Sequence, residues 1–210
     1  MNNLTIVAFG DSITQAGEVS LEKRWPSLLE SVLATHEAKV VNAGVGGNTS
    51  REGLARIDEV LAHQPALVLV EFGGNDATDE VERNVPLDEF LRNLETMREK
   101  FQVSGAAMLL LTFPPIVNAW SQHTEPVREF HFLRYGGMDE HVEFYRQATH
   151  YFAARNELKM ADIDVALRRA AKTEGWEKFF QPDGVHLTQD GNRVVFETVL
   201  QEVMLWLGAA

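Results

Sequence analysis

Ser12 follows an apolar run near the start of the chain, within the sequence FGDSIT. A serine at the carboxyl end of a buried strand can attack a carbonyl carbon if a nearby base accepts its hydroxyl proton. The same sequence also suits the start of a helix, where Asp11 and Ser12 would be ordinary caps. The other polar segments of the chain must decide between a nucleophile and a cap.

Among the seven histidines, His186 has the neighbours that a catalytic base needs. It lies in PDGVHLT, where Asp183 stands three residues before it across a glycine. An acid at this spacing can accept a hydrogen bond from the imidazole Nδ1 and stabilise the imidazolium. The segment also fits an ordinary turn before a helix. Ser12, His186 and Asp183 are therefore the candidate catalytic residues.

Two further segments carry groups that can stabilise a developing oxyanion. The glycine-rich stretch NAGVGGNTS, residues 42–50, lets backbone N–H groups approach a ligand closely. The sequence GGND places the side-chain amide of Asn75 after another apolar run. Each segment alone also fits a tight turn. Together with the backbone N–H of Ser12, they have the donor types of an oxyanion hole.

Five short apolar runs predict the strands of a parallel sheet, because continuous hydrophobic runs are typical of strands buried on both faces. Helical patterns separate them. The predicted strands are residues 4–9, 39–42, 66–72, 106–113 and 158–163, and the predicted helices are residues 27–36, 54–61, 87–102, 142–156 and 192–207. This alternation predicts a single domain over residues 1–210 with a three-layer α/β/α fold and a flavodoxin-like five-stranded parallel sheet.

Parallel strands place their carboxyl ends at one edge of a sheet, and ligands bind there. Ser12, the glycine-rich stretch and Asn75 all follow predicted strands, so we expect them to converge. The sequence leaves open whether residues 164–180 bring His186 to the same edge.

Residues 114–138 form a long segment with prolines and aromatic residues, which predicts an elaborated loop that is a wall or a lid of a pocket. Its aromatic rings can stack on sugars, enclose an acyl chain or cover the sheet as core. The candidate substrate-contacting residues are Asp11, Trp120, Phe130, Phe132 and Tyr135.

The net charge of −12 makes nucleic acid a poor partner. The chain has no cysteine, which excludes disulfides and thiolate zinc sites, and its histidines lack metal-ligand spacing. We therefore expect no metal site. No export signal is visible at the N-terminus, and the first apolar run is too short to span a bilayer, which predicts a cytoplasmic protein without integral membrane association. The oligomeric state stays open.

The segments FGDSIT, NAGVGGNTS, GGND and DGVHLT stand in the order typical of the SGNH hydrolases, also called the GDSL esterase/lipase family. The chain resembles this family from Gly10 to Thr188. The resemblance implies a flavodoxin-like α/β/α fold, hydrolysis of carboxylic esters and no cofactor. The α/β-hydrolase class fits less well, because the chain has no G-x-S-x-G pentapeptide.

The same resemblance implies a role for each residue that matches a family block. Ser12 is similar to the family's nucleophile and first oxyanion donor. Gly47 and Asn75 resemble the second and third donors, while Asp183 and His186 resemble the orienting acid and the base.

The predicted function is a serine esterase for small or medium acyl groups, with a small-molecule ester as its partner. Two alternatives stay open. The first is a carbohydrate or nucleoside O-deacetylase of the same family. The second is a non-catalytic, flavodoxin-like ligand-binding module, since GVGG superficially resembles a phosphate loop but lacks the G-x-G-x-x-G spacing.

Overall fold

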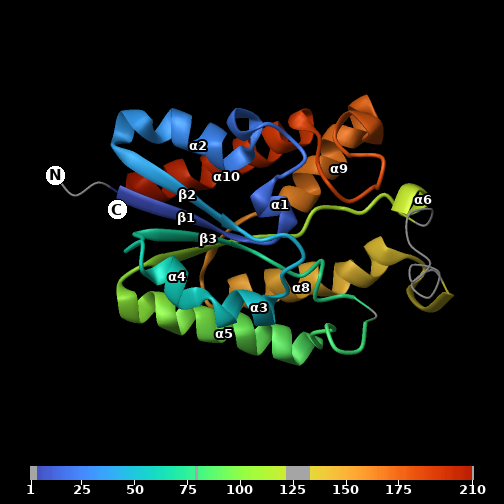
Figure 1. The fold of residues 1–210 in the computed structure, drawn as a ribbon, viewed down its shortest axis with the longest axis horizontal. Coiled ribbons are helices and arrows are strands. Elements are labelled where there is room, and N and C mark those ends of the chain that lie inside the picture. Colours follow the sequence, from blue (N-terminus) through green and yellow to red (C-terminus); the bar gives the residue numbers. More distant parts are fainter. Residues whose placement is uncertain (1–3, 79, 122–132, 210) are drawn as a thin grey trace.

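Five parallel strands form the middle layer of the structure, a computed structural model that describes residues 4–78, 80–121 and 133–209 (Figure 1). The strands are β1 (Leu4–Gly10), β2 (Ala38–Gly44), β3 (Leu67–Glu71), β4 (Ala107–Leu111) and β5 (Lys159–Ala161). Their order is β2-β1-β3-β4-β5, and every neighbouring pair is parallel. This topology confirms the predicted flavodoxin-like sheet.

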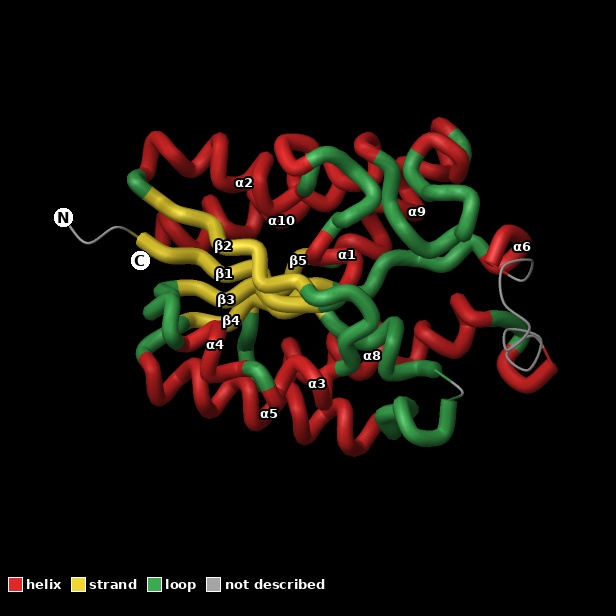
Figure 2. Tube along the Cα trace, viewed as in Figure 1, coloured by secondary structure: helices red, strands yellow, loops and turns green. Residues whose placement is uncertain are grey.

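Helices cover both faces of the sheet, which gives three layers (Figures 1 and 2). One face carries α2 (Trp25–Leu33), α9 (Ile163–Glu174) and α10 (Gln189–Ala209). The other carries α3 (Ser50–Ala55), α4 (Ile57–Leu61), α5 (Leu87–Ser104) and α8 (Met138–Arg155). The shorter elements are α1 (Ser12–Gln15), α6 (Asn118–Ser121) and three 3₁₀ turns at Leu21–Lys23, Ala34–His36 and Trp176–Lys178.

The strands have continuous hydrophobic sequences because helices cover both faces of the sheet. All of β3 is buried, as are the last five residues of β1. The edge strand β2 instead alternates over its first three residues, with Lys39 exposed between Ala38 and Val40. No helix among the described residues is long and apolar enough to cross a lipid bilayer.

Three helical regions differ from the sequence-based expectation, and in the first of them the single helix expected over residues 54–61 is divided at Arg56 into α3 and α4. Helix α9 occupies part of residues 164–180, to which the sequence analysis assigns no element. It buries Ile163, Leu167 and Ala171 at four-residue spacing, the pattern of an amphipathic helix. Helix α8 begins at Met138 rather than at Val142, with Asp139 and Glu140 in its first turn, where the helix dipole favours acids.

The described parts of the segment 114–138 are tied to the start of α8. The Asn118 amide donates to Glu140 Oε2 at 2.6 Å, and the backbone N–H of Asp139 donates to Asn118 Oδ1 at 3.0 Å. Asp139 in turn accepts a hydrogen bond from the Ile116 N–H at 2.8 Å. These bonds place the residues just after β4 against α8 and beside the edge where the strands end.

Candidate active site

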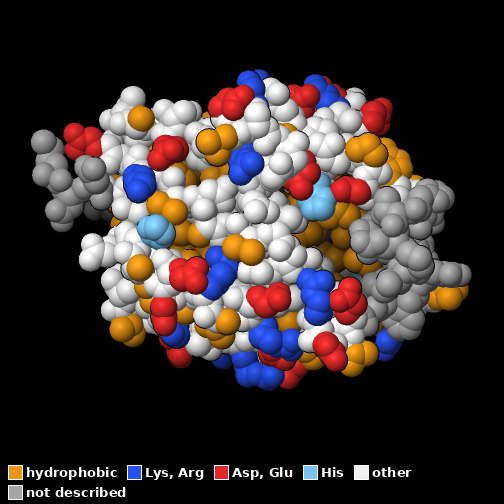
Figure 3. All heavy atoms as spheres, in the orientation of Figure 1, with side chains coloured by type: hydrophobic (Ala, Val, Ile, Leu, Met, Phe, Trp, Pro, Cys, Tyr) orange, Lys and Arg blue, Asp and Glu red, His pale blue; other side chains and the backbone are white. Residues whose placement is uncertain are grey.

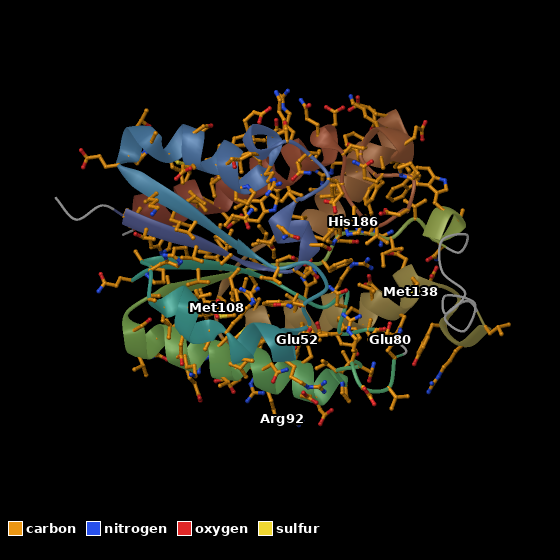
Figure 4. All side chains as sticks on the ribbon, viewed as in Figure 1. Glu52, Glu80, Arg92, Met108, Met138 and His186 are labelled. Carbon is orange, nitrogen blue, oxygen red and sulfur yellow. The ribbon has the colours of Figure 1, made fainter. Side chains whose placement is uncertain are left out.

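A pocket of about 420 Å³ opens where the strands end at their carboxyl edge. Ser12, Asn75, Phe113 and His186 all line it, although they come from four different segments of the chain. In Figure 4, the labelled His186, Met138 and Glu80 lie toward the right, the side to which the strands point. Figure 3, drawn from the same side, shows a hollow with hydrophobic atoms beside a histidine at the position of His186. We call this cavity the Ser12 pocket.

Ser12, His186 and Asp183 form a continuous chain of hydrogen bonds. His186 Nε2 lies 3.0 Å from Ser12 Oγ, and His186 Nδ1 lies 2.7 Å from Asp183 Oδ2. The other oxygen, Asp183 Oδ1, accepts the backbone N–H groups of Val185 and His186 at 2.8 and 2.9 Å. The structure thus brings Asp183 and His186 to Ser12, from which the sequence separates them by more than 170 positions.

These contacts shift both pKa values in the sense that a base with an orienting acid requires. Burial alone would raise the pKa of Asp183, but the hydrogen bonds from His186 and the backbone of Val185 hold it well below its ordinary value. The hydrogen bond with Asp183 raises the pKa of His186 above 6.5, although burial opposes the shift. Asp183 therefore stays ionised and strengthens His186 as a proton acceptor.

A closed loop before α10 carries Asp183 and His186 to the sheet edge. Phe180 and Leu187 pair as an isolated antiparallel bridge, and the Gln181 N–H donates to the His186 carbonyl at 2.7 Å. The loop turns at Gly184, whose φ of +73° is a left-handed value that favours glycine. The Gly184 carbonyl accepts the Val117 N–H at 2.7 Å, which fixes the loop against the segment after β4.

The turn at Ser12 assigns the role of helix cap to Asp11 and leaves the Ser12 hydroxyl available as a nucleophile. Asp11 is the N-cap of α1, and its Oδ1 accepts the Ile13 N–H at 2.9 Å. Ser12 is the first residue of that helix, so its hydroxyl is not used for capping and lies toward His186 instead. A Cβ on Gly44 would meet the backbone N of Gln15 at 2.2 Å, so glycine at this position lets β2 approach α1.

The two other candidate oxyanion donors line the same pocket. Gly47 has a φ of +78°, in the left-handed region, and its carbonyl accepts Arg83 Nη2 at 2.6 Å. The Asn75 amide donates to Asp11 Oδ2 at 2.8 Å and to the Asn48 carbonyl at 3.2 Å. These bonds hold the Asn75 amide and the glycine-rich loop beside Ser12, which is the donor set that an oxyanion needs.

Asp11 does not line the Ser12 pocket, which corrects its prediction as a substrate contact. It is fully buried and belongs to a pair of carboxyl groups with Glu71, which is 1% exposed. Burial raises the pKa of Asp11 to about 6 and that of Glu71 well above its ordinary value. Glu71 Oε2 accepts the Thr14 hydroxyl at 3.0 Å. We interpret Glu71 as the neutral partner that lets Asp11 remain the acceptor for Asn75, because two adjacent buried carboxylates strongly disfavour double ionisation.

The aromatic substrate contacts expected from residues 114–138 are not found in the described lining of the pocket. Trp120 lines a separate cavity with Phe180 and Pro182, because α6 lies against the loop before α10. The Tyr135 ring stacks on His141, with 3.8 Å between ring centroids, and is held by α8. Phe130 and Phe132 lie outside the described residues. The described apolar wall is instead formed by Phe113, Ile116, Met138 and Val185.

Several polar residues that the sequence analysis does not select take part in the site, among them Glu18, Arg83 and Asp76. Glu18 and Arg83 line the pocket from loops whose sequences give no signal. Asp76 joins the two oxyanion segments, because its carboxylate accepts both the N–H and the hydroxyl of Ser50, at 3.1 and 2.5 Å. Burial raises the pKa of Asp76 to about 7. The signal for Asp76 was its place directly after Asn75 in GGND.

Within the described part of the chain, no group of three or more histidine, aspartate or glutamate side chains is arranged to hold a metal ion. The glycines that resemble a phosphate loop face the serine turn instead: a Cβ on Gly46 would lie 3.8 Å from the Ser12 Cβ. Ser12, His186, Gly47 and Asn75 surround one point at the end of β1, an arrangement suited to acyl transfer.

Comparisons with known proteins agree with this geometry. The sequence model of the GDSL-like lipase/acylhydrolase family matches residues 8–194. The chain is 30% identical over 206 residues to a GDSL esterase/lipase of Arabidopsis thaliana, with 92% of this chain and 83% of that protein aligned. It is similar to the crystal structure of a lipase/acylhydrolase from Enterococcus faecalis, with a TM-score of 0.76, 27% identity and 95% of each chain covered.

A shorter match has a higher identity. Over 110 residues the chain is 39% identical to esterase TesA of Pseudomonas aeruginosa, and this match covers 51% of the chain and 53% of that protein. In this match the chain spans about half the length of the curated relative.

Proposed function

Because this chain belongs to the GDSL-like lipase/acylhydrolase family, we propose that it hydrolyses carboxylic esters of small or medium acyl groups, with Ser12 as its nucleophile. The observation that carries this proposal is the hydrogen-bond chain from Ser12 Oγ through His186 to Asp183. A serine hydroxyl is a weak nucleophile, and this chain supplies the base and the orienting acid that activate it.

The proposed reaction has two steps. Ser12 Oγ attacks the ester carbonyl while His186 Nε2 takes the hydroxyl proton, and His186 then gives that proton to the departing alcohol. A water molecule, deprotonated by His186 Nε2, attacks the acyl-serine carbonyl; the bond to Ser12 Oγ then breaks, His186 returns the proton to Ser12 Oγ, and the acid is released. In both steps the oxyanion lies among the N–H groups of Ser12 and Gly47 and the Asn75 amide, which replaces one of its present bonds with one to the oxyanion.

The size and the walls of the pocket favour substrates with a short acyl group. Phe113, Ile116 and Met138 form a rigid apolar surface, and the Phe113 ring packs so closely on Gly74 that a Cβ there would meet it at 2.1 Å. A volume of about 420 Å³ lies toward the lower end for small-molecule sites and must hold both halves of the ester. We therefore expect acetyl and butyryl esters to be better substrates than octanoyl esters.

The first test is hydrolysis of p-nitrophenyl acetate, butyrate and octanoate by the wild type and by Ser12→Ala. Loss of the nucleophile should lower kcat by about 10⁴-fold or more, since nucleophile and base act as one unit. Ser31→Ala is the matched control, because Ser31 is exposed on α2 and bonds only to its own helix. Equal activity in the wild type and Ser12→Ala would contradict the proposal.

A second candidate function is O-deacetylation of a carbohydrate or nucleoside. It is favoured by the polar part of the pocket, where Gln15, Thr78 and Arg83 offer hydrogen-bonding groups to a hydroxyl-rich alcohol. The two functions separate in a comparison of kcat/KM between an acetylated sugar and p-nitrophenyl acetate. A clear preference for the sugar over simple alkyl acetates would select the deacetylase.

A further inference from the structure

Glu18 lies beside the nitrogen of His186 that faces Ser12. Its Oε1 atom is 3.8 Å from His186 Nε2, the same nitrogen that lies 3.0 Å from Ser12 Oγ. Glu18 comes from the loop after α1, lines the Ser12 pocket and keeps about a third of its side chain exposed (31%). None of the proposed reaction steps uses it.

The position of Glu18 marks the part of the pocket that receives the leaving alcohol. In the proposed reaction, His186 Nε2 protonates the alcohol oxygen, so that oxygen must lie within hydrogen-bond reach of Nε2. A carboxylate 3.8 Å from the same nitrogen therefore borders the substituents of the alcohol. The oxyanion donors Gly47 and Asn75 belong to other segments, after β2 and near the end of β3.

In the part of the chain that the structure describes, no lysine or arginine side chain forms an ion pair with the Glu18 carboxylate. The other carboxylate of the pocket, Glu80, lies 3.6 Å from Arg83, and Arg83 also binds the Gly47 carbonyl. Glu18 has no such partner among the described residues, and its contact within 4 Å is with the His186 ring, which is neutral when it acts as the base. Figure 3 shows acidic side chains next to the histidine at this rim of the hollow.

We infer that Glu18 is a specificity residue that favours esters whose alcohol part carries a positive charge near the ester oxygen, as in esters of amino alcohols. This inference rests on the proposed ester hydrolysis and adds the chemistry of the leaving group to it. The carboxylate attracts a cation at this position and repels an anionic alcohol. The net charge of −12 extends the same preference to the approach of the substrate.

The test compares two acetate esters of nearly the same shape: acetylcholine, and its uncharged analogue in which a tert-butyl group replaces the trimethylammonium group. The ratio of their kcat/KM values is measured for the wild type and for Glu18→Gln. Comparing this ratio between the two proteins cancels the different intrinsic reactivities of the esters. We expect the ratio to fall by roughly three- to tenfold in Glu18→Gln, the range for a partly exposed charge pair.

Glu22→Gln is the matched control, because it removes one negative charge from the neighbouring 3₁₀ turn without touching the pocket. We expect its ratio to equal that of the wild type. A second readout is the pH profile with the uncharged ester. Asp183, Glu18 and Asp11 all raise the pKa of His186, so Glu18→Gln should move the acid limb to lower pH.

The outcomes separate this inference from the function on which it rests. An unchanged ratio in Glu18→Gln, or an equal fall in Glu22→Gln, would overturn the role of Glu18 while ester hydrolysis stands. If the wild type hydrolyses none of the three esters, that is acetylcholine, its uncharged analogue and p-nitrophenyl acetate, the proposed function is wrong and the inference fails with it.

Discussion

The reactive side chains of the site are oriented by hydrogen bonds to their other polar atoms. Both oxygens of Asp183 are bound, one by the His186 ring and the other by two backbone N–H groups. His186 therefore has one ring orientation, with Nε2 directed to Ser12. Asp11 plays a similar part on the other side, since it caps α1 with one oxygen and holds the Asn75 amide with the other.

The first prediction at this scale concerns pH. The kcat/KM for p-nitrophenyl acetate should fall at acid pH with a midpoint above 6.5, because the base must be neutral and Asp183 raises the pKa of His186. In Asp183→Asn the midpoint should move to lower pH, and kcat should fall by about 10³- to 10⁴-fold, because the ring loses its orienting acid.

The measurement is a profile of initial rates from about pH 4.5 to pH 9 for both proteins. Asp190→Asn is a suitable control, because Asp190 is an exposed acid in the first turn of α10. A wild-type rate that stays flat between pH 5 and pH 8 would argue against His186 as the base.

At the scale of elements, an ion cluster between α8 and α9 supports one wall of the pocket. Arg146 is 2% exposed and donates to the Phe113 and Pro114 carbonyls at 3.0 and 2.7 Å. It also pairs with Asp139 at 2.6 Å and with Asp164 at 3.1 Å. The segment after β4, which carries Phe113, is thereby held by a charge on α8.

We predict that Arg146→Met destabilises the fold by about 3–5 kcal/mol, because it leaves two partly buried carboxylates with fewer partners. The preference for acetate over octanoate should also weaken, because the wall at Phe113 becomes less rigid. The first effect is measured by urea unfolding and the second by kcat/KM across the ester series.

Arg169→Met makes the same chemical change at an exposed position of α9 and should alter stability by less than about 0.5 kcal/mol. Equal stability of the Arg146 and Arg169 variants would show that the cluster does not hold the wall.

At the scale of the whole molecule, the buried acids and the large negative charge both lower the stability of the folded state as the pH rises. The folded protein raises the pKa of Asp76 from 3.8 to about 7 and that of Asp11 to about 6. For such carboxyl groups the folded state favours the protonated form. Their contribution to stability is therefore complete below about pH 4 and is lost as the pH rises through these folded values.

We predict that the melting temperature falls as the pH rises from 5 to 8. The raised pKa of His186 contributes in the same sense, and so does the self-repulsion of a chain with a net charge of −12. Thermal unfolding followed by circular dichroism at constant ionic strength checks this. Asp76→Asn should have a shallower dependence on pH, and a wild-type melting temperature that rises over the same interval would refute the prediction.

The strands could be predicted from the sequence because burial on both faces selects continuous apolar residues, as in β3. Helix α9 could have been found in the same way, since Ile163, Leu167 and Ala171 already mark its buried face. The substrate-contacting residues could not be predicted from the sequence, because contact with a pocket depends on packing between distant segments. Asp11 and Trp120 have suitable side chains, yet one is buried and the other lies in a different cavity.

The sequence by itself determined the fold class, the family and the kinds of groups that follow each strand, because these depend on local patterns along the chain. Only the tertiary structure decided that His186 meets Ser12, that Asp11 and Glu71 form a buried pair, and that Glu18 lies beside His186. Those contacts join residues from separate loops. Their distances are set by how helices and the loop before α10 pack on the sheet, which no local pattern encodes.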